Sequence, residues 1–335
     1  MSKNVYVLVE QRDGIVAKVG KELLGKAVEL AKDLDQKVVG ILLGSKIKDV
    51  ANSLFTYGAD EVVVVDHPFL EEYTTEPYAK ALFAVIQECQ PEILLYGATS
   101  IGRDLAPRVA GRVHTGLTAD CTKLDIDPET KLLLMTRPAF GGNIMATIVC
   151  KNYRPQMATV RPGVMKTMPK DKTRTGVLKE ITIDFKPEDQ NVKIREVVRE
   201  TKKSTDITEA KYLVSGGRGI GNANGFNMLR DLAAVIGGEV SSSRANVDAG
   251  WIEKDRQVGQ TGKTVRPDLY MACGISGAIQ HVAGMEGSEY IIAINKNDTA
   301  PIFDVADLGV IGDVKAIIPK LTEALKKYKE EKANQ

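Results

Sequence analysis

Short apolar runs alternate with helical patterns along the first third of the chain. The runs cover residues 5–9, 38–43, 61–66 and 93–96. Between the first two runs, leucine and alanine recur every three or four residues, and residues 103–111 form a further helical pattern. The recurring positions are Leu23, Ala27, Leu30, Ala31 and Leu34. Continuous apolar strands separated by helices are typical of a parallel sheet covered on both faces, so we expect an α/β domain here.

The pattern changes after residue 115. Apolar runs at 132–136, 144–149 and 157–160 are separated by stretches with no helical pattern, which favours hairpins or antiparallel additions. Charged residues dominate 166–205, where we expect a strand at 181–185. The end of this segment, near 190–207, is predicted to be a linker.

A second α/β unit is predicted from Lys211 onward. The run at 212–214 leads into a glycine-rich segment, and a helical pattern follows. Its apolar positions are Phe226, Leu229, Leu232, Ala233 and Ile236. Further strand-like runs lie at 239–242, 269–273 and 290–295, and an amphipathic helix closes the chain, with Pro319 expected in its first turn.

These patterns predict an α/β protein of two domains, at residues 1–204 and 205–335. Each is expected to contain a mainly parallel sheet flanked by helices. The first resembles a nucleotide-binding domain with extra strands, and the second a doubly wound domain.

Composition narrows the function classes. The 335 residues carry 45 basic and 44 acidic side chains, a net charge of +1, which disfavours nucleic acid or an anionic membrane as partner. None of the four cysteines forms a CxxC pair, so no zinc or iron–sulfur spacing is present and no metal site is predicted. The first apolar run is too short for a signal peptide or a membrane span. We expect a cytoplasmic protein with free thiols.

The glycine-rich segment at 216–221 carries the first chemical signal. Glycines between a strand and a helix direct backbone N–H groups toward an anion. The spacing of Gly219, Gly221 and Gly225 misses the standard dinucleotide fingerprint, and the next strand ends in Ser243 and Arg244 rather than in an acidic residue. This disfavours NAD and leaves open an NADP site that uses Arg244.

Five polar or glycine-rich segments are expected to follow strand ends in this unit. They lie at 216–221, 243–250, 258–263, 274–281 and 295–299. The carboxyl ends of parallel strands meet at one edge of a sheet, where ligands bind. Together the segments predict a large, elongated, phosphate-bearing ligand. No acid–base pair or nucleophile pairing is evident, so no catalytic residue is predicted.

Several of these segments are long enough to be recognised as family motifs. They read Val214-Ser-Gly-Gly-Arg-Gly, Ser243-Arg-Ala-Asn-Val-Asp-Ala-Gly, Val258-Gly-Gln-Thr-Gly-Lys, Gly274-Ile-Ser-Gly-Ala-Ile-Gln-His, Ile294-Asn-Lys, Ala300-Pro-Ile-Phe and Ala306-Asp-Leu-Gly. In this order they resemble the FAD domain of electron transfer flavoprotein alpha subunits, over about residues 205–330. The N-terminal half resembles the more variable domain of that family. Its Thr115-Gly-Leu-Thr-Ala-Asp and Arg137-Pro-Ala-Phe-Gly-Gly segments are similar to those of members from anaerobic bacteria.

The resemblance implies bound FAD and a set of contact residues. These are Arg218, Ser243, Arg244, Val258, Gly259, Gln260, Thr261, Gly262, Ser276, Gly277, Ala278, Ile279, Gln280, His281, Asn295, Asp313 and Val314. Arg244 is expected against the isoalloxazine ring, Thr261 near flavin N5 and His281 near the N1–C2=O edge. Ser276 and the turn after it are expected to hold the pyrophosphate. The adenosine end is assigned to Asn295 and Asp313.

A fixed cation beside the flavin fits this assignment. At about 4 Å and an effective dielectric constant of about 20, one charge contributes about 4 kcal/mol to a negatively charged reduced flavin. At about 59 mV per tenfold change in a one-electron equilibrium, this sets a ceiling near 170 mV, which solvent lowers. Arginine suits the role because it stays charged and stacks on planar rings.

The resemblance also implies how the chain works. It implies an electron-carrying subunit that pairs with a small beta subunit through residues 1–204 and passes single electrons to or from an acyl-CoA dehydrogenase. The similarity to anaerobe members extends this to an electron-bifurcating complex with NADH and ferredoxin. Three alternatives stay open: a non-bifurcating shuttle with AMP in the small subunit, a self-contained NADP or flavin oxidoreductase, and a nucleotide-binding regulatory protein without redox function.

Overall fold

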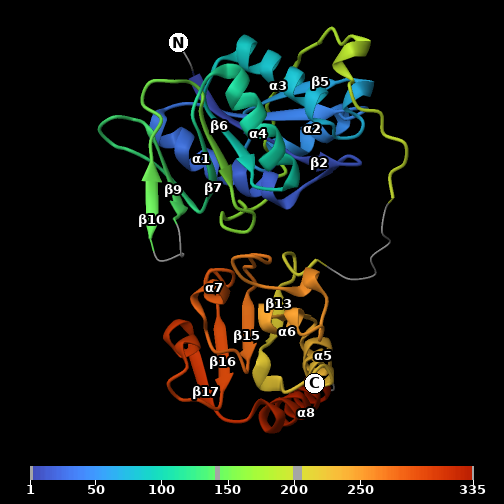
Figure 1. Cartoon of the computed structure of the whole chain (residues 1–335), viewed down its shortest axis with the longest axis vertical. Helices are drawn as coiled ribbons and strands as arrows, with labels where there is room; N and C mark the ends of the chain where they lie inside the picture. Colours follow the sequence, from blue (N-terminus) through green and yellow to red (C-terminus); the bar gives the residue numbers. More distant parts are fainter. Residues whose placement is uncertain (1–2, 140–143, 199–205, 334–335) are drawn as a thin grey trace. The chain divides into compact units, whose positions relative to one another are not determined.

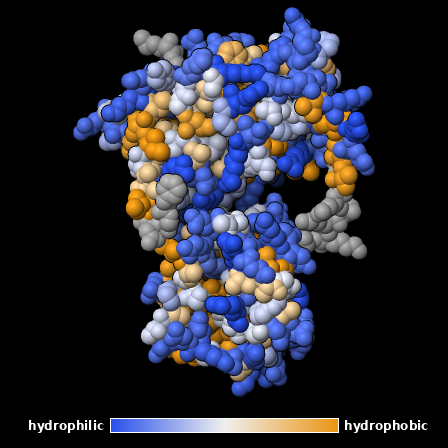
Figure 2. Space-filling model, in the orientation of Figure 1, coloured by the Kyte–Doolittle hydropathy of each residue, from blue (hydrophilic) through white to orange (hydrophobic). Residues whose placement is uncertain are grey.

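The computed structural model describes residues 3–139, 144–198 and 206–333. The chain forms two compact units, Met1–Val198 and Arg199–Gln335 (Figure 1). Both units are α/β and contain a parallel sheet flanked by helices, so the predicted fold class is confirmed. Figure 2 shows hydrophilic side chains over much of the visible face of each unit, with apolar groups between them. Part of the predicted linker and part of the Arg137 motif, at 199–205 and 140–143, lie outside the described residues.

The first unit is built on a seven-stranded sheet of order β12-β5-β4-β1-β6-β11-β7, and every neighbouring pair in it is parallel. The strands are β1 (Lys3–Leu8), β4 (Val38–Gly44), β5 (Glu61–Asp66), β6 (Pro91–Gly97), β7 (Leu117–Cys121), β11 (Gln156–Val160) and β12 (Val177–Glu180). A two-residue pair, β2 (Gln11–Arg12) and β3 (Ile15–Val16), follows β1.

Helices cover both faces of this sheet because the strands are apolar on both sides. One core contains Leu23 and Leu54, from α1 (Lys18–Leu34) and α2 (Lys48–Phe55). The other contains Leu82 and Leu105, from α3 (Thr75–Cys89) and α4 (Ser100–Val113). Two short 3-10 helices also occur, η1 (Pro68–Leu70) and η2 (Pro187–Asp189).

An antiparallel sheet interrupts the parallel order. Strands β8 (Lys123–Ile126), β9 (Leu133–Pro138) and β10 (Met145–Ile148) form it, as predicted for this part of the chain. The antiparallel prediction is wrong for residues 157–160, because β11 runs parallel to both β6 and β7. The strands β7 and β11 are parallel neighbours, and parallel strands need a crossover connection. Here the three-stranded sheet forms this connection in place of a helix.

Two other predictions of elements are also wrong. The strand in the charged segment is β12, which ends at Glu180, so residues 181–185 follow it rather than form it. β12 is an exposed edge strand and therefore carries little apolar signal. The last helix begins at Val314, where the Asp313 carboxylate accepts the backbone N–H of Lys315, and Pro319 lies inside it.

The second unit is a five-stranded parallel sheet of order β14-β13-β15-β16-β17. The strands are β13 (Tyr212–Gly216), β14 (Glu239–Ser242), β15 (Leu269–Cys273), β16 (Ile291–Asn295) and β17 (Leu308–Ile311). Helices α5 (Gly225–Ile236) and α8 (Val314–Ala333) pack on one face through Phe226, Leu229 and Ile318. On the other face, the core includes residues of two short helices, α7 (Ile279–Val282) and η5 (Pro301–Val305). Three further short helices, η3 (Arg218–Ile220), α6 (Arg244–Asp248) and η4 (Lys254–Arg256), also occur, and Ile220 of η3 and Val247 of α6 pack with α5 and α8.

Candidate functional site

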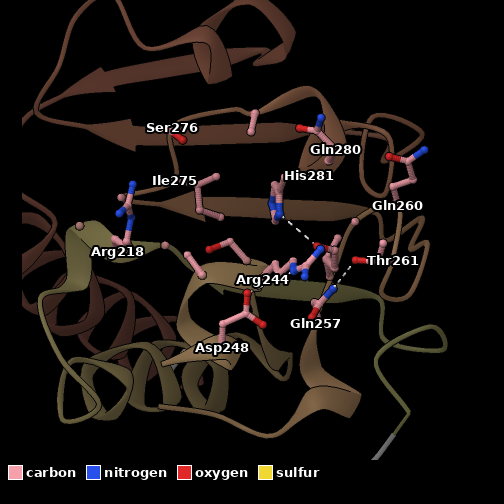
Figure 3. A pocket seen from close by; sticks show the side chains of 18 of the residues that line it. Arg218, Arg244, Asp248, Gln257, Gln260, Thr261, Ile275, Ser276, Gln280 and His281 are labelled. Carbon is pink, nitrogen blue, oxygen red and sulfur yellow. Dashed lines mark hydrogen bonds and ion pairs between the residues drawn. The ribbon is translucent and has the colours of Figure 1, made fainter. Parts of the chain in front are cut away.

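The strand order of the second unit places a cavity at its switch point. From β13, the chain goes first to β14 on one side and then to β15 on the other. Loops leaving adjacent strands on either side of such a point diverge, and ligands bind between them. A cavity of about 740 Å³ lies here, lined by the loops after β13, β14, β15 and β16 (Figure 3). Its volume falls in the upper part of the range for small-molecule sites, about 300–1,000 Å³.

Glycines let two of these loops touch directly. A Cβ added at Gly217 would lie 2.2 Å from the carbonyl oxygen of Gly274, which itself has φ +65°. The Gly219 N–H donates to the same oxygen at 3.0 Å. The glycine-rich segment therefore joins the loop after β15 and forms the cavity wall. The helix that the sequence predicted after this segment, α5, begins at Gly225, which does not line the cavity.

A pair of opposite charges stands on the short helix α6. The Arg244 Nε atom lies 3.2 Å from a carboxylate oxygen of Asp248, one turn further along the helix. Both side chains line the cavity, and both are about two-thirds exposed. The predicted cation is therefore present, but its charge is partly compensated and partly screened by solvent. The sequence analysis missed Asp248, although its i,i+4 spacing from Arg244 was a usable signal.

A buried amide holds the Thr261 side chain. The Gln257 Nε2 atom lies 3.0 Å from Thr261 Oγ1, and Gln257 is buried. An amide that donates to the hydroxyl oxygen leaves the hydroxyl proton available to a ligand. Gln257 was not predicted as a site residue, and only the tertiary contact with Thr261 identifies it.

The His281 ring lies in the wall with both nitrogens bound. The backbone carbonyl of Val258 is 3.1 Å from Nδ1, and the Tyr270 hydroxyl is 2.9 Å from Nε2. The residue is buried, and this burial lowers the pKa of His281 to about 4. At neutral pH the ring therefore carries no charge.

The structure brings most of the predicted site residues to this one cavity. Those in the wall are Arg218, Ser243, Arg244, Val258, Gly259, Gln260, Thr261, Ser276, Ala278, Gln280, His281 and Asn295. Figure 3 shows the labelled side chains spread along the strand ends, with Arg218 on one side and Gln260 and Thr261 on the other.

Five predicted residues lie outside this wall, and each has a different neighbour. Gly262 packs on the Gln257 backbone, and Gly277, at φ +89°, on the backbone of Ile302. Ile279 is exposed on α7, and Val314 is buried at the start of α8. Asp313 pairs with Lys296 at 2.8 Å, and this lysine holds the pKa of the Asp313 carboxyl below its usual value.

The wall also contains residues that were not predicted, namely Gly217, Gly219, Ala245, Asp248, Gln257, Gly274 and Ile275. The glycines among them could have been found, since they belong to motifs already singled out.

The wall suits a large anionic dinucleotide. Arg218 and Arg244 supply positive charge, the glycine loops expose backbone N–H groups, and much of the remaining wall is neutral. Among the described residues no group of three or more potential metal ligands occurs, and none of their helices has the length and apolarity to cross a membrane. These features fit FAD.

Comparison with known proteins gives the same assignment. The family model for the electron transfer flavoprotein domain matches residues 5–186, and the model for the electron transfer flavoprotein FAD-binding domain matches residues 206–286. The chain is 55% identical to an electron transfer flavoprotein subunit alpha of Thermoanaerobacterium thermosaccharolyticum, over 98% of this chain and 99% of that protein. It is 51% identical to the Clostridium acetobutylicum subunit, over 97% of each chain. It is also 47% identical to an acryloyl-CoA reductase electron transfer subunit beta of Anaerotignum propionicum, over 98% of this chain and 96% of that protein.

Proposed function

Because this chain belongs to the electron transfer flavoprotein alpha-subunit family, whose C-terminal domain binds FAD, we propose that it relays single electrons to or from an acyl-CoA dehydrogenase. FAD supplies the redox chemistry, since it exchanges electrons one at a time. The chain's own residues bind it, orient it and set the charge around it. The observation that carries the proposal is the cavity at the switch point, with Arg244 as an exposed cation in its wall.

We assign the wall residues to parts of the cofactor. Ser276 and the turn after it bind the pyrophosphate through backbone N–H groups. Arg244 would lie against the isoalloxazine ring, and Thr261, held by Gln257, would donate its hydroxyl proton at the N5 side. Asn295 binds the adenosine end. Asp313 and Val314 stand next to it, because the Gly312 N–H donates to the Asn295 carbonyl oxygen.

The first domain, residues 1–204, is proposed to bind a small beta subunit. The outer edge of β10 has no strand partner among the described residues. Ile144, Met145 and Ile148 are exposed there, and Figure 2 shows apolar groups around β9 and β10 on the visible face. An apolar, unpaired edge strand is unfavourable in water and is a common site of strand addition by a partner.

We further propose that the complex bifurcates electrons. NADH delivers two electrons to the small subunit; one passes to ferredoxin and the other through this chain to the dehydrogenase. Support comes from the relatives in anaerobes, one of which is named for acryloyl-CoA reductase. This chain needs only a site that favours the reduced cofactor, which the positive charge of Arg244 supplies. The competing function is a shuttle whose small subunit holds AMP.

Counting the nucleotides of the purified heterodimer tests the proposal. Two FAD per heterodimer, both reduced by NADH, support bifurcation. One FAD and one AMP, with no reaction toward NADH, contradict it and favour the simple shuttle. Release of no FAD at all contradicts the relay itself. A colourless protein would favour a nucleotide-binding regulatory protein. Turnover of a substrate in the absence of any partner protein would favour a self-contained oxidoreductase.

A further inference from the structure

The chain enters the second domain in direct contact with one loop of the cavity. Asp206 is the first residue of this domain that the structure describes, and the connection from the first domain leads into it. Its Oδ1 atom accepts a hydrogen bond from the Lys263 Nζ atom at 2.9 Å. The next residue, Ile207, is 1% exposed and packs in the same core as Val258. An ionic contact and an apolar contact therefore join neighbouring residues of the entering chain to the loop that runs from Val258 to Lys263, here called the cavity loop.

Lys263 is also the residue that closes the cavity loop. Its N–H donates to the Gln257 carbonyl oxygen at 2.7 Å, and its carbonyl oxygen accepts the N–H of Gly259 at 3.1 Å. Between these two bonds lie Gln260 and Thr261, which line the cavity, whereas Lys263 is not part of the wall. The lysine thus holds the entering chain with its side chain and the cavity loop with its backbone.

The Asp206 carboxylate is already oriented by the turn that follows it. Its Oδ1 atom accepts both the backbone N–H and the hydroxyl of Thr208, each at 3.0 Å. Less side-chain freedom is then lost when the lysine binds to it. The side chain of Asp206 is 52% exposed and that of Lys263 is 30% exposed. An ion pair exposed to this extent changes an equilibrium by about twofold to fivefold.

We propose that Asp206 and Lys263 are positioning residues that couple the connection between the domains to FAD binding. When FAD orders the cavity loop, it also holds the lysine in place for the aspartate. Because coupling between two binding equilibria is reciprocal, the anchored connection favours FAD by the same factor. The inference rests on the proposed function, because it takes the cavity to be the FAD site. The start of the second domain is then held most firmly while the cofactor is bound.

Hydrogen exchange in the purified heterodimer, read by mass spectrometry on peptides of this chain, measures both sides of the coupling. Protection of residues 258–263 reports FAD in this chain, whatever nucleotide the small subunit holds. Protection of residues 206–208 reports the anchored connection, because the Thr208 N–H donates to Asp206. Adding FAD to FAD-depleted heterodimer should slow exchange in both segments, by about twofold to fivefold at 206–208. Exchange at 206–208 that ignores FAD, while exchange at 258–263 responds, overturns the inference.

The substitution Lys263→Met removes the ammonium group and keeps the backbone bonds of the cavity loop. FAD affinity, read from the protection of residues 258–263, should fall by about twofold to fivefold, and the response of residues 206–208 to FAD should disappear. Lys254→Met is the matched control, because it removes an exposed charge of the same sign from η4, outside the cavity wall. Equal FAD affinity in the two variants, or a retained response at 206–208 in Lys263→Met, contradicts the positioning role.

The substitution Asp206→Asn tests the same contact from the other side. Its amide oxygen can still accept the Thr208 N–H, so the turn is kept while the charge is lost. In a double-mutant cycle, Asp206→Asn combined with Lys263→Met should bind FAD as well as Lys263→Met alone does. Losses that multiply indicate two independent effects and overturn the inference. Should Lys263→Met not fold, Asp206→Asn decides: weaker FAD binding than in the control supports the role, and equal binding contradicts it.

Failure of this inference can be separated from failure of the proposed function. A heterodimer in which FAD protects no part of the cavity wall contradicts the proposed function, and the coupling with it. A heterodimer in which FAD protects residues 258–263, but in which the Lys263 and Asp206 variants behave like the control, contradicts only the coupling.

Discussion

The guanidinium of Arg244 and the carboxylate of Asp248 face each other across 3.2 Å, on the single turn that forms α6. The arginine therefore does not act on the cavity as an isolated charge. Part of its field is cancelled by a neighbour that also lines the wall. Exposure of both side chains reduces the effect further, because water screens them.

Replacing Arg244 by alanine should lower the reduction potential of the bound flavin without unfolding the domain. The side chain is mostly exposed, so little packing is lost. Removal of the cation destabilises the negatively charged reduced cofactor, by some tens of millivolts and well below the ceiling of about 170 mV. Redox titration of the heterodimer measures the shift. Arg230→Ala, on α5 and outside the cavity, is the control. An unchanged potential in Arg244→Ala would remove that residue from its assigned role.

The substitution Asp248→Asn should act in the opposite direction. It keeps the shape of the side chain but leaves the charge of Arg244 uncompensated, so the flavin potential should rise. Asp248 is the last residue of α6, and loss of a negative charge at a helix C-terminus does not disfavour the helix. The same titration measures the shift. A lower potential in Asp248→Asn would mean that the aspartate mainly orients the arginine rather than compensates it.

Acid should destabilise the second domain through His281. Its pKa is about 4 in the folded protein and about 6.5 when unfolded, so the unfolded chain binds the extra proton between these values. Stability supplied by the neutral ring is complete above pH 6.5 and is lost as the pH falls toward 4. Between pH 7 and pH 5 this costs about 2 kcal/mol.

Urea unfolding at the two pH values measures this loss. His281→Gln is the comparison, because an amide can bond to the same two partners and does not titrate in this range. The glutamine variant should lose less stability between pH 7 and pH 5. Equal losses in the two proteins would show that other groups cause the acid sensitivity.

Limited proteolysis tests the proposed boundary between the domains. Residues 190–198 form no helix or strand, and Val192, Val197 and Val198 are exposed. Trypsin should cut first near Lys193 and Arg195, or at the basic residues just after them, and leave two resistant fragments. First cleavage within residues 1–160 would count against this boundary.

The sequence was sufficient for elements whose signal is local. The four valines of β5 and the apolar face of α5 appear in the structure where they were predicted. A buried strand and an amphipathic helix can each be recognised from the pattern of apolar residues within a short stretch of sequence. The predicted start of the last helix was wrong because proline is common in the first turn of a helix, and Pro319 was therefore placed there. In the structure the helix begins earlier, where the Asp313 carboxylate accepts the backbone N–H of Lys315.

Residues whose role depends on distant partners could not be predicted. Tyr270 belongs to the site only because β15 brings its hydroxyl to His281. Gln257 belongs to it only because the loop after it returns Thr261 to its side. Such contacts depend on how the loops fold over the sheet. They cannot be predicted from the spacing of residues along the sequence. The motif residues, in contrast, were found because glycines and strand ends are visible in the sequence.

The position of β11 has a consequence for the order in which the first unit can form. This strand lies between β6 and β7, and in the part of the chain that the structure describes β7 has no other strand partner in its sheet. During synthesis β7 emerges first, but it cannot pair until the chain has passed through the three-stranded sheet and returned with β11. A contact between segments so far apart in sequence closes slowly, because the loop entropy must be lost before the pairing is gained. The last strands on this side of the sheet should therefore be late events in folding, and β7 should depend on chaperones more than the earlier strands do while it waits for its partner.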